Sequence, residues 1–511
     1  NMDLFYFFIH LGIEKLNPGG FLSFITTNYW ITKSQKTGIR FLKPHILNEC
    51  FLVQYIDLSN LKIFEDARGQ HNCIFVLQKK NSQEKVERLN KDIQIIQIFG
   101  SSNAKNKPDS LNELIFKDLI NNKNSSYLRT YRSALTNNDL SHDGSWNLLY
   151  PEKVKLVIDT IENYCTINGN ILRLNDFFII RNGLILINDD IFILKEGKEL
   201  KIEKNDFFIK INEKYIMLNE AEKDRLKKVY KSKSIVPYGY IHEEYLGFIL
   251  YFNKNEFRSD STTERNLFFE RKYPSLTKYI KQFEIKLREI LINAKENPDD
   301  FYFPRRGSFI RQFEKNPKGL LIDLEPSYDN GRKIFFKYIS KHNIFGYTDT
   351  PYYATSDTYF LWPRFNENSI NFLFLLAYLN SSLVTFLYKA KNITIKRSKT
   401  RLEYGLPIPN IDTFKTEEKS IIINLIENLT SFLISGLDSN LDKKIHQNFD
   451  TVINFNSQDI SQFRKEIIRA LKNNDKKTIQ RIINLFIFQL FDLDETELTK
   501  LLNEYYNMTS N

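Results

Sequence analysis

A run of cations without acids is the feature of this sequence with the clearest chemistry. Residues 389 to 401 read KAKNITIKRSKTR, and six of these 13 residues are lysine or arginine while none is acidic. Such side chains displace the counterions around nucleic-acid phosphates, so the segment predicts a salt-dependent contact with DNA. A solvated charged surface is the alternative. The candidates are Lys389, Lys391, Lys396, Arg397, Lys399 and Arg401.

A second basic segment also carries aromatic residues. Residues 301 to 313 read FYFPRRGSFIRQF, in which Arg305, Arg306 and Arg311 are interleaved with Phe and Tyr. Arginine can donate two hydrogen bonds to a guanine edge, and aromatic rings can stack on bases. We therefore expect these arginines to bind DNA as well. A turn at Pro304 followed by an amphipathic helix is compatible with the same residues.

The sequence carries no motif for a metal site, a nuclease or a serine hydrolase. The seven histidines form no HExxH motif or close cluster, and the three cysteines, Cys50, Cys73 and Cys165, form no CxxC pair, so no metal site is expected. The same cysteine usage indicates no disulfide framework and fits a reducing cytoplasm. Neither a nuclease constellation nor a G-x-S-x-G elbow is present.

Composition agrees with a soluble protein that binds a polyanion. The 511 residues carry a formal net charge of +10, and 42 Phe and 27 Tyr can fill large cores. This length suggests two to four domains. No run of 18 apolar residues and no signal peptide is found, so we expect no membrane association. The first residue is Asn, which suggests a piece of a longer protein.

The first 100 residues predict an α/β arrangement that needs more strands. A helix over 4–16 leads through Pro18-Gly19-Gly20 into an apolar strand over 21–27, and a further helix over 34–46 follows. Two more strands, 50–58 and 71–80, are too close for a helical crossover and should pair antiparallel. The first strand is apolar like a central strand, so we expect βα units before residue 1.

The rest of the chain divides by pattern. Residues 81 to 110 are polar and suggest a linker, and 111 to 170 suggest mixed helices and loops. Short strands and turns dominate up to about residue 412, and the end is helical. The expected regions are 1–100, half of a catalytic domain; 101–170, a connection; 171–414, a mixed α+β recognition domain; and 415–511, a helical region.

These segments resemble a known family. Residues 2–33, MDLFYFFIHLGIEKLNPGGFLSFITTNYWITK, with 61–80, LKIFEDARGQHNCIFVLQKK, look like the second half of the catalytic domain of adenine-specific DNA methyltransferases. The resemblance is to the TaqI-like branch, which includes type IIG restriction–modification enzymes. Five later segments resemble, in order, the family's target-recognition domain and C-terminus. They begin LNDFFII, SIVPYGY, YPSLTKY, FLLAYLN (with YGLPIPN after it) and TIQRIIN.

The resemblance implies a Rossmann-like fold and methyl transfer from S-adenosylmethionine to adenine N6 of double-stranded DNA. It places Phe64 where the family stacks an aromatic ring on the flipped adenine, and Phe8 beside the cofactor's adenine ring. Packing in the core is the alternative for both. Residues Thr26 to Trp30 lie at the carboxyl end of the strand, where ligands bind in such sheets. They are expected to form a DNA-facing rim, and the alternative is a polar loop in which the Trp ring is buried.

The family's glycine-rich cofactor loop and Asn-Pro-Pro-Tyr tetrapeptide do not occur in the sequence. We therefore expect this chain to bind DNA, to be inactive alone, and to need a missing N-terminal half or partner chain. One alternative is a non-catalytic DNA-specificity subunit of a restriction system. Another is an RNA-modifying enzyme or an α/β protein that binds no nucleic acid.

Overall fold

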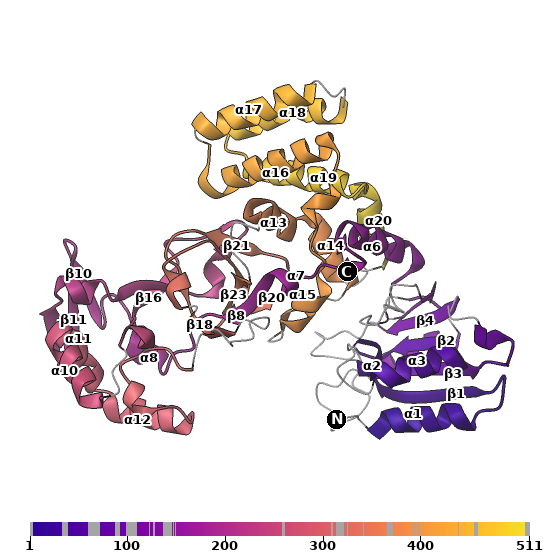
Figure 1. Ribbon diagram of the computed structural model, residues 1–511, viewed down its shortest axis with the longest axis horizontal. Helices are drawn as coiled ribbons and strands as arrows, with labels where there is room; N and C mark the ends of the chain where they lie inside the picture. The colour runs from indigo at the N-terminus through magenta and orange to yellow at the C-terminus, as the bar shows by residue number, and fades with distance from the viewer. Residues whose placement is uncertain are drawn as a thin grey trace. The chain divides into compact units, whose positions relative to one another are not determined.

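The computed structural model divides into two compact units, residues 1–160 with 496–511, and residues 161–495 (Figure 1). The residues it describes are 4–32, 39–59, 72–86, 92–98, 110–121, 123–125, 128–135, 146, 148, 150–257, 261–307, 310–312, 321–323, 325–340, 342–364, 371–391, 393, 395–396, 399–437, 439–453 and 458–505.

The first unit is built on a five-stranded sheet in the order β1-β3-β2-β4-β5. The pairs β1–β3, β2–β3 and β4–β5 are antiparallel, and β2–β4 is parallel. The predicted antiparallel pairing of the strands near 50 and 75 is confirmed. The strands are β1 (Phe21–Thr27), β2 (Cys50–Asp57), β3 (Asn72–Lys79), β4 (Ile93–Ile98) and β5 (Leu128–Ser133).

Helices cover both faces of this sheet. On one face, Tyr6 and Ile9 of α1 pack with Leu42 of α3 against Tyr55 and Phe75. On the other face, Ile115 of α4 packs with Ile56 and Ile96. The same cluster includes Leu58, Ile98 and Leu128. The helices of these two clusters are α1 (Leu4–Lys15), α2 (Tyr29–Thr32), α3 (Ile39–Glu49) and α4 (Ser110–Ile120). Helix α6 (Glu152–Tyr164) begins in the first unit and ends in the second.

The junction between α1 and β1 forms as its residues dictate. Pro18 cannot continue a hydrogen-bonded helix, and Gly19 has a φ of +79°, a conformation that L side chains rarely adopt. The amide of Gly20 donates to the carbonyl of Asn17 (2.9 Å), and that of Gly19 donates to Lys79 (2.8 Å). These bonds fix the end of the helix beside β3.

Strand β1 is an edge strand of the described sheet, and Phe21 is exposed. The central position expected for β1 referred to a sheet completed by further strands, and it stays a prediction. Two other expectations about this unit were wrong. The sheet has five strands where three were expected, because β4 lies within the supposed linker 81–110. A boundary at residue 100 would cut between β4 and β5, which pair along their whole length.

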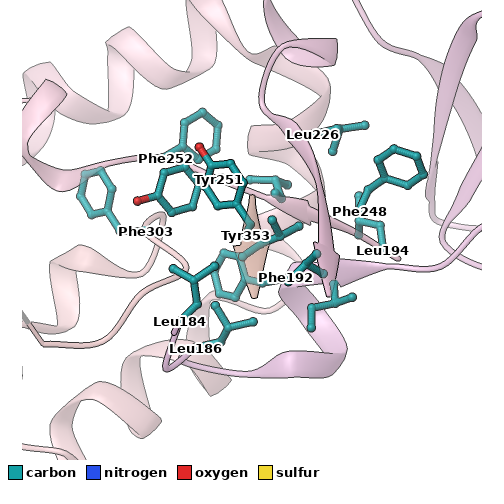
Figure 2. Packing of buried hydrophobic residues seen from close by; sticks show 14 of the residues in the cluster. Leu184, Leu186, Phe192, Leu194, Leu226, Phe248, Tyr251, Phe252, Phe303 and Tyr353 are labelled. Carbon is teal, nitrogen blue, oxygen red and sulfur yellow. The ribbon is translucent and has the colours of Figure 1, made fainter. Parts of the chain in front are cut away.

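The second unit joins several sheets around a large aromatic core, confirming a region of short strands. One sheet has the order β21-β19-β23-β8 and another β22-β13-β16-β9. Figure 2 shows Phe192, Tyr251, Phe252 and Tyr353 packed in this core. The strands are β8 (Phe178–Asn182), β9 (Ile193–Leu194), β13 (Leu226–Tyr230), β16 (Tyr245–Leu250), β19 (Lys333–Lys337), β21 (Phe345–Thr348), β22 (Tyr353–Ala354) and β23 (Thr358–Pro363).

Smaller elements complete this unit. A three-stranded sheet comprises β10 (Leu200–Glu203), β11 (Asp206–Ile211) and β12 (Lys214–Met217). The two-stranded pairs are β6 (Thr166–Ile167) with β7 (Asn170–Ile171), β14 (Ile235–Val236) with β15 (Gly239–Tyr240), β17 (Ile310–Gln312) with β18 (Leu321–Asp323), and β20 (Ile339–Ser340) with β24 (Ile395–Lys396). The main helices before the C-terminal region are α10 (Thr262–Lys272), α11 (Pro274–Lys281), α12 (Glu284–Asn293), α13 (Phe372–Leu379), α14 (Ser382–Ala390) and α15 (Thr400–Gly405).

The elements described within residues 415–511 are all helices, as expected. A short 3-10 turn, Ile411–Thr413, precedes them. Its helices are α16 (Glu417–Ser435), α17 (Ser439–Ile453), α18 (Gln458–Lys472), α19 (Lys476–Leu490) and α20 (Glu495–Tyr505). The proposed boundary at residue 415 does not separate compact units, because α16 to α19 belong to the same unit as the strands before them.

Among the described residues, no helix is by itself long and apolar enough to cross a bilayer. Helices α13 and α14 are bent by 55° at their junction, and only as a pair do they have the length and apolar composition of a membrane span.

Candidate nucleic-acid interface

The carboxyl ends of β1 and β2 meet at one edge of the first sheet, where a small polar cluster lies. Asp57 ends β2 and is buried. The backbone amide of Ser59 donates to Oδ1 of Asp57 (3.1 Å), and the Ser59 hydroxyl donates to the same oxygen. The side-chain amide of Asn28 in turn donates to Ser59 Oγ (3.0 Å). Ligands of open α/β sheets bind beyond such strand ends.

This cluster was only partly foreseen. Asn28 was expected at a ligand-facing rim, whereas Asp57 and Ser59 were not singled out. The available signal was a carboxylate directly after the apolar strand CFLVQYI. Phe64, the expected base-stacking residue, lies in the following segment, which is outside the described residues.

Trp30 is buried, as in the alternative interpretation of this loop. Its ring is fully buried and packs edge-on against Phe75, with ring centroids 4.8 Å apart, and against Trp146 at 5.7 Å. This contact holds α2 against the end of the sheet. Trp30 is therefore a structural anchor and does not form a surface ring.

Phe8, the expected cofactor contact, does not pack into the core. Its side chain is 54% exposed, whereas Tyr6, Ile9 and Ile13 of the same helix are buried. The core-packing alternative is therefore wrong for Phe8. An exposed aromatic face remains available at this position for stacking.

Lys391 is not available to DNA. It lies just after α14, and its side chain is almost fully buried in an ion pair with Glu162 of α6. Arg173 Nη1 lies 3.5 Å from the same carboxylate. Burial lowers the pKa of Lys391. Burial also raises the pKa of Glu162, but Lys391 and Arg173 outweigh that effect and lower it overall.

The other cations of the segment 389–401 lie in different environments. Lys389 is exposed near the end of α14. Lys399 is half-buried, pairs with Glu403 (2.9 Å) and donates to the carbonyl of Ile180. Lys396 lies in β24 (Ile395–Lys396) and Arg401 in α15, but their side chains, and Arg397 entirely, are outside the described residues.

The arginines of 301–313 are likewise divided. Arg305 is buried, donates to the Tyr328 hydroxyl (3.2 Å) and has its Nε 3.7 Å from Glu325. Arg306 is half-buried and its backbone amide donates to Ile185. Arg311 lies in β17 (Ile310–Gln312), a short strand where an amphipathic helix was the alternative, and its side chain is outside the described residues.

Arg305 and Lys391 therefore need to be removed from the DNA-contacting set. Both use their charge on buried carboxylates of this chain, and turning either one outward would take a compensating cation away from a buried acid. The sequence could not indicate this, since both carboxylates lie outside the basic segments.

In the part of the chain that the structure describes, no group of three or more His, Cys, Asp or Glu side chains is placed to hold a metal ion.

Two family descriptions match the sequence. Residues 1–64 match the Eco57I restriction-modification methylase family, and residues 277–405 match the TaqI-like C-terminal specificity domain. A curated relative, the type II methyltransferase M.MjaIV of Methanocaldococcus jannaschii, is 26% identical over 243 residues, covering 47% of this chain and 72% of the relative. The resemblance to restriction–modification methyltransferases is thereby confirmed.

Solved structures of restriction enzymes also align with the chain. The type IIG endonuclease BpuSI aligns at 13% identity and a TM-score of 0.32, over 95% of this chain and 49% of its own. The type IIL enzyme MmeI in complex with DNA aligns at 10% identity and a TM-score of 0.42, over 99% and 51%. The chain thus spans about half the length of these enzymes.

Proposed function

We propose that this chain, which carries a segment of the restriction-modification methylases and a TaqI-like specificity domain, is the DNA-recognition part of an adenine-N6 DNA methyltransferase that uses S-adenosylmethionine. The observation that carries the proposal is the order of these two matches along one chain. In this reading the second unit binds duplex DNA, and the first contributes half of the catalytic sheet.

The DNA contacts of the proposal come from the cations that remain accessible. Lys389 is exposed and is the main candidate, whereas Lys399, at the start of α15, is half-buried and pairs with Glu403. We add Lys396, Arg397, Arg401 and Arg311, whose side chains are outside the described residues, and the half-buried Arg306. Contacts to phosphates position a protein on the duplex and give binding its salt dependence.

The flipped adenine would lie beyond the carboxyl ends of β1 and β2. We place Phe64 there as the stacking residue, in the segment that follows the Asp57–Ser59–Asn28 cluster. Stacking offsets the cost of extruding a base from the duplex. The hydrogen-bonded cluster would fix the start of that segment.

This chain alone does not make a complete site for the methyl donor. Phe8 offers an exposed ring for the donor's adenine, but no glycine-rich loop and no Asn-Pro-Pro-Tyr occurs in the sequence. S-adenosylmethionine would supply an electrophilic methyl group when bound. The residues of this chain would stack on its adenine ring and orient the target base.

The missing groups would come from the other half of the sheet, docked on β1 and α1. The outer edge of β1 pairs with none of the described residues, and Phe21 and Ile25 are exposed on it. Leu4, Phe7 and Leu11 form an exposed apolar stripe on α1, with Phe8 beside them. A helix that is apolar on most sides is normally buried, which supports a βα-containing partner half here.

A non-catalytic specificity subunit is the second candidate. The lack of the two motifs favours it, whereas the apolar surface of α1 and β1 has no role in it. Incorporation of labelled methyl groups after addition of a polypeptide that carries both motifs would exclude it.

The test uses the full chain, a fluorescent mixed-sequence duplex and labelled S-adenosylmethionine. We expect affinity to fall steeply with salt and no methyl incorporation by the chain alone. Lys389→Met should weaken binding and reduce the salt slope by about 0.9 per lost phosphate contact. Lys214→Met, an exposed lysine of β12, is the matched control and should change neither. No binding to duplex DNA at low salt would overturn the proposal, and turnover by the chain alone would overturn its incompleteness.

A further inference from the structure

Two large apolar side chains are exposed within the basic region of the second unit. Ile339 is 58% exposed in β20 (Ile339–Ser340), and Tyr404 is 56% exposed in α15. Isolated exposed apolar residues are common on protein surfaces and need no explanation. These two differ because both adjoin the cationic segment.

Ile339 and Tyr404 belong to one neighbourhood. Ile339 pairs antiparallel with Lys396 of β24, so it lies directly against the basic segment. The ring of the preceding residue, Tyr338, lies 5.0 Å from that of Tyr359. The pKa of Tyr359 is raised to about 12, mainly by burial and then by the nearby Tyr338 and Glu403. Glu403 directly precedes Tyr404. Tyr359 thus contacts the residue before Ile339 and feels the charge of the residue before Tyr404.

The helical turn that carries Tyr404 is fixed to the core. Leu402 and Leu406 are fully buried, and the amide of Leu174 donates to Leu406 (3.2 Å). Glu403 turns inward to pair with Lys399. Tyr404 is thus the outward residue of an anchored turn, and an aromatic ring on such a support loses little conformational entropy on contact.

The charge around these residues favours a polyanion over an apolar protein partner. Lys399 neutralises Glu403, the one acid on α15, and Lys337 ends the strand just before β20. Arg181 is exposed on the edge strand β8, next to Ile180, whose carbonyl accepts from Lys399. Apolar side chains within such a surface can insert between base pairs once the phosphates are held.

We propose that Ile339 and Tyr404 form an apolar wedge that unstacks a base step of duplex DNA while the surrounding cations hold the backbone. The inference rests on the proposed DNA binding and adds the residues that would deform the duplex. Because unstacking costs least at flexible steps, the wedge would also contribute sequence preference.

The test applies the full chain to a library of random duplexes and treats the bound fraction with permanganate, which oxidises unstacked thymines. Sequencing then locates the reactive positions. Wild type should give reactive thymines that free DNA lacks. Tyr404→Ala and Ile339→Ala should return reactivity to the free-DNA level and weaken binding roughly tenfold without changing the salt slope. Tyr404→Phe should retain reactivity, because the ring is kept.

Ile285→Ala is the matched control, since Ile285 of α12 is 79% exposed and lies outside the basic region. It should behave as wild type. Wild-type binding without reactive thymines, or reactivity unchanged in both alanine variants, would overturn the wedge and leave the proposed DNA recognition intact. Failure of wild type to bind duplex DNA would overturn both.

Discussion

At the scale of single residues, the environment decides what a cation does. Lys389 and Lys391 are two positions apart in one basic segment, yet Lys389 is exposed while Lys391 is paired with buried Glu162. A buried pair gains little over an apolar replacement of both partners. Loss of one partner alone is costly, because the other charge stays buried.

We predict opposite phenotypes for these neighbours. Lys391→Met should lower the free energy of unfolding by about 3 kcal/mol, since Glu162 keeps only the more distant Arg173. Lys389→Met, at an exposed position, should lose much less stability than Lys391→Met but bind DNA more weakly. Urea denaturation followed by circular dichroism measures the first effect and fluorescence anisotropy the second. A stable Lys391→Met variant with impaired DNA binding would contradict this assignment.

A second residue-scale prediction concerns acid stability. Hydrogen bonds from Lys79 and Lys85 lower the pKa of Glu49 from 4.5 to about 2. The folded state therefore holds this carboxylate charged where the unfolded chain would already take up a proton. The resulting stabilisation is complete above pH 4.5 and is lost as the pH falls towards about 2.

Glu49→Gln should therefore be less stable than wild type at neutral pH, and the difference should disappear on acidification through this range. Urea midpoints measured across the acid range test it, with exposed Glu113→Gln as the control that follows wild type. A difference that stays constant with pH would show that the ion pairs are not its cause.

At the scale of elements, α1 and β1 present more apolar surface than an exposed helix and an edge strand usually carry. Tyr6, Ile9 and Ile13 cover the sheet, while Leu4, Phe7 and Leu11 face away from that core. Exposed apolar strand edges promote unwanted pairing unless something covers them. Both elements are suited to an interior position in a larger sheet.

Phe7→Glu combined with Leu11→Lys should remove this surface without loss of stability. The new charges lie four residues apart on α1 and support the helix. We expect lower fluorescence of a bound hydrophobic dye and an unchanged urea midpoint. Phe116→Glu, which removes one exposed ring from α4, should change the dye signal less. Unfolding of the double variant would mean that the stripe is packed within the chain.

At the scale of the whole molecule, the two compact units have separate cores. Ile95 belongs to the first core and Phe360 to the second, and both are fully buried. Chains with several domains commonly depart from two-state unfolding. We therefore expect two calorimetric transitions.

Ile95→Ala should lower one transition and Phe360→Ala the other, each by about 2 to 5 kcal/mol of unfolding free energy. The exposed Ile285→Ala should shift neither. A single transition lowered by both core variants would show that the units unfold together. Differential scanning calorimetry of the full chain makes the distinction.

The sequence by itself determined the local elements of this protein. Apolar periodicity placed α1, β1, β2 and β3 within a few residues and predicted a helical C-terminal region, because amphipathic spacing and Pro-Gly punctuation act over one or two turns. It also located the cationic segments and the family motifs, which are properties of contiguous residues.

The tertiary structure alone decided which of those residues remain available. Lys391 meets Glu162 across 229 positions, so no local pattern could indicate that its charge is used inside the fold. The same holds for β4 and β5, whose partners are set by the sheet, and for β1, whose place at an edge of the described sheet its apolar residues do not indicate. Pairing and burial depend on which distant segments meet, and that information is absent from any short stretch.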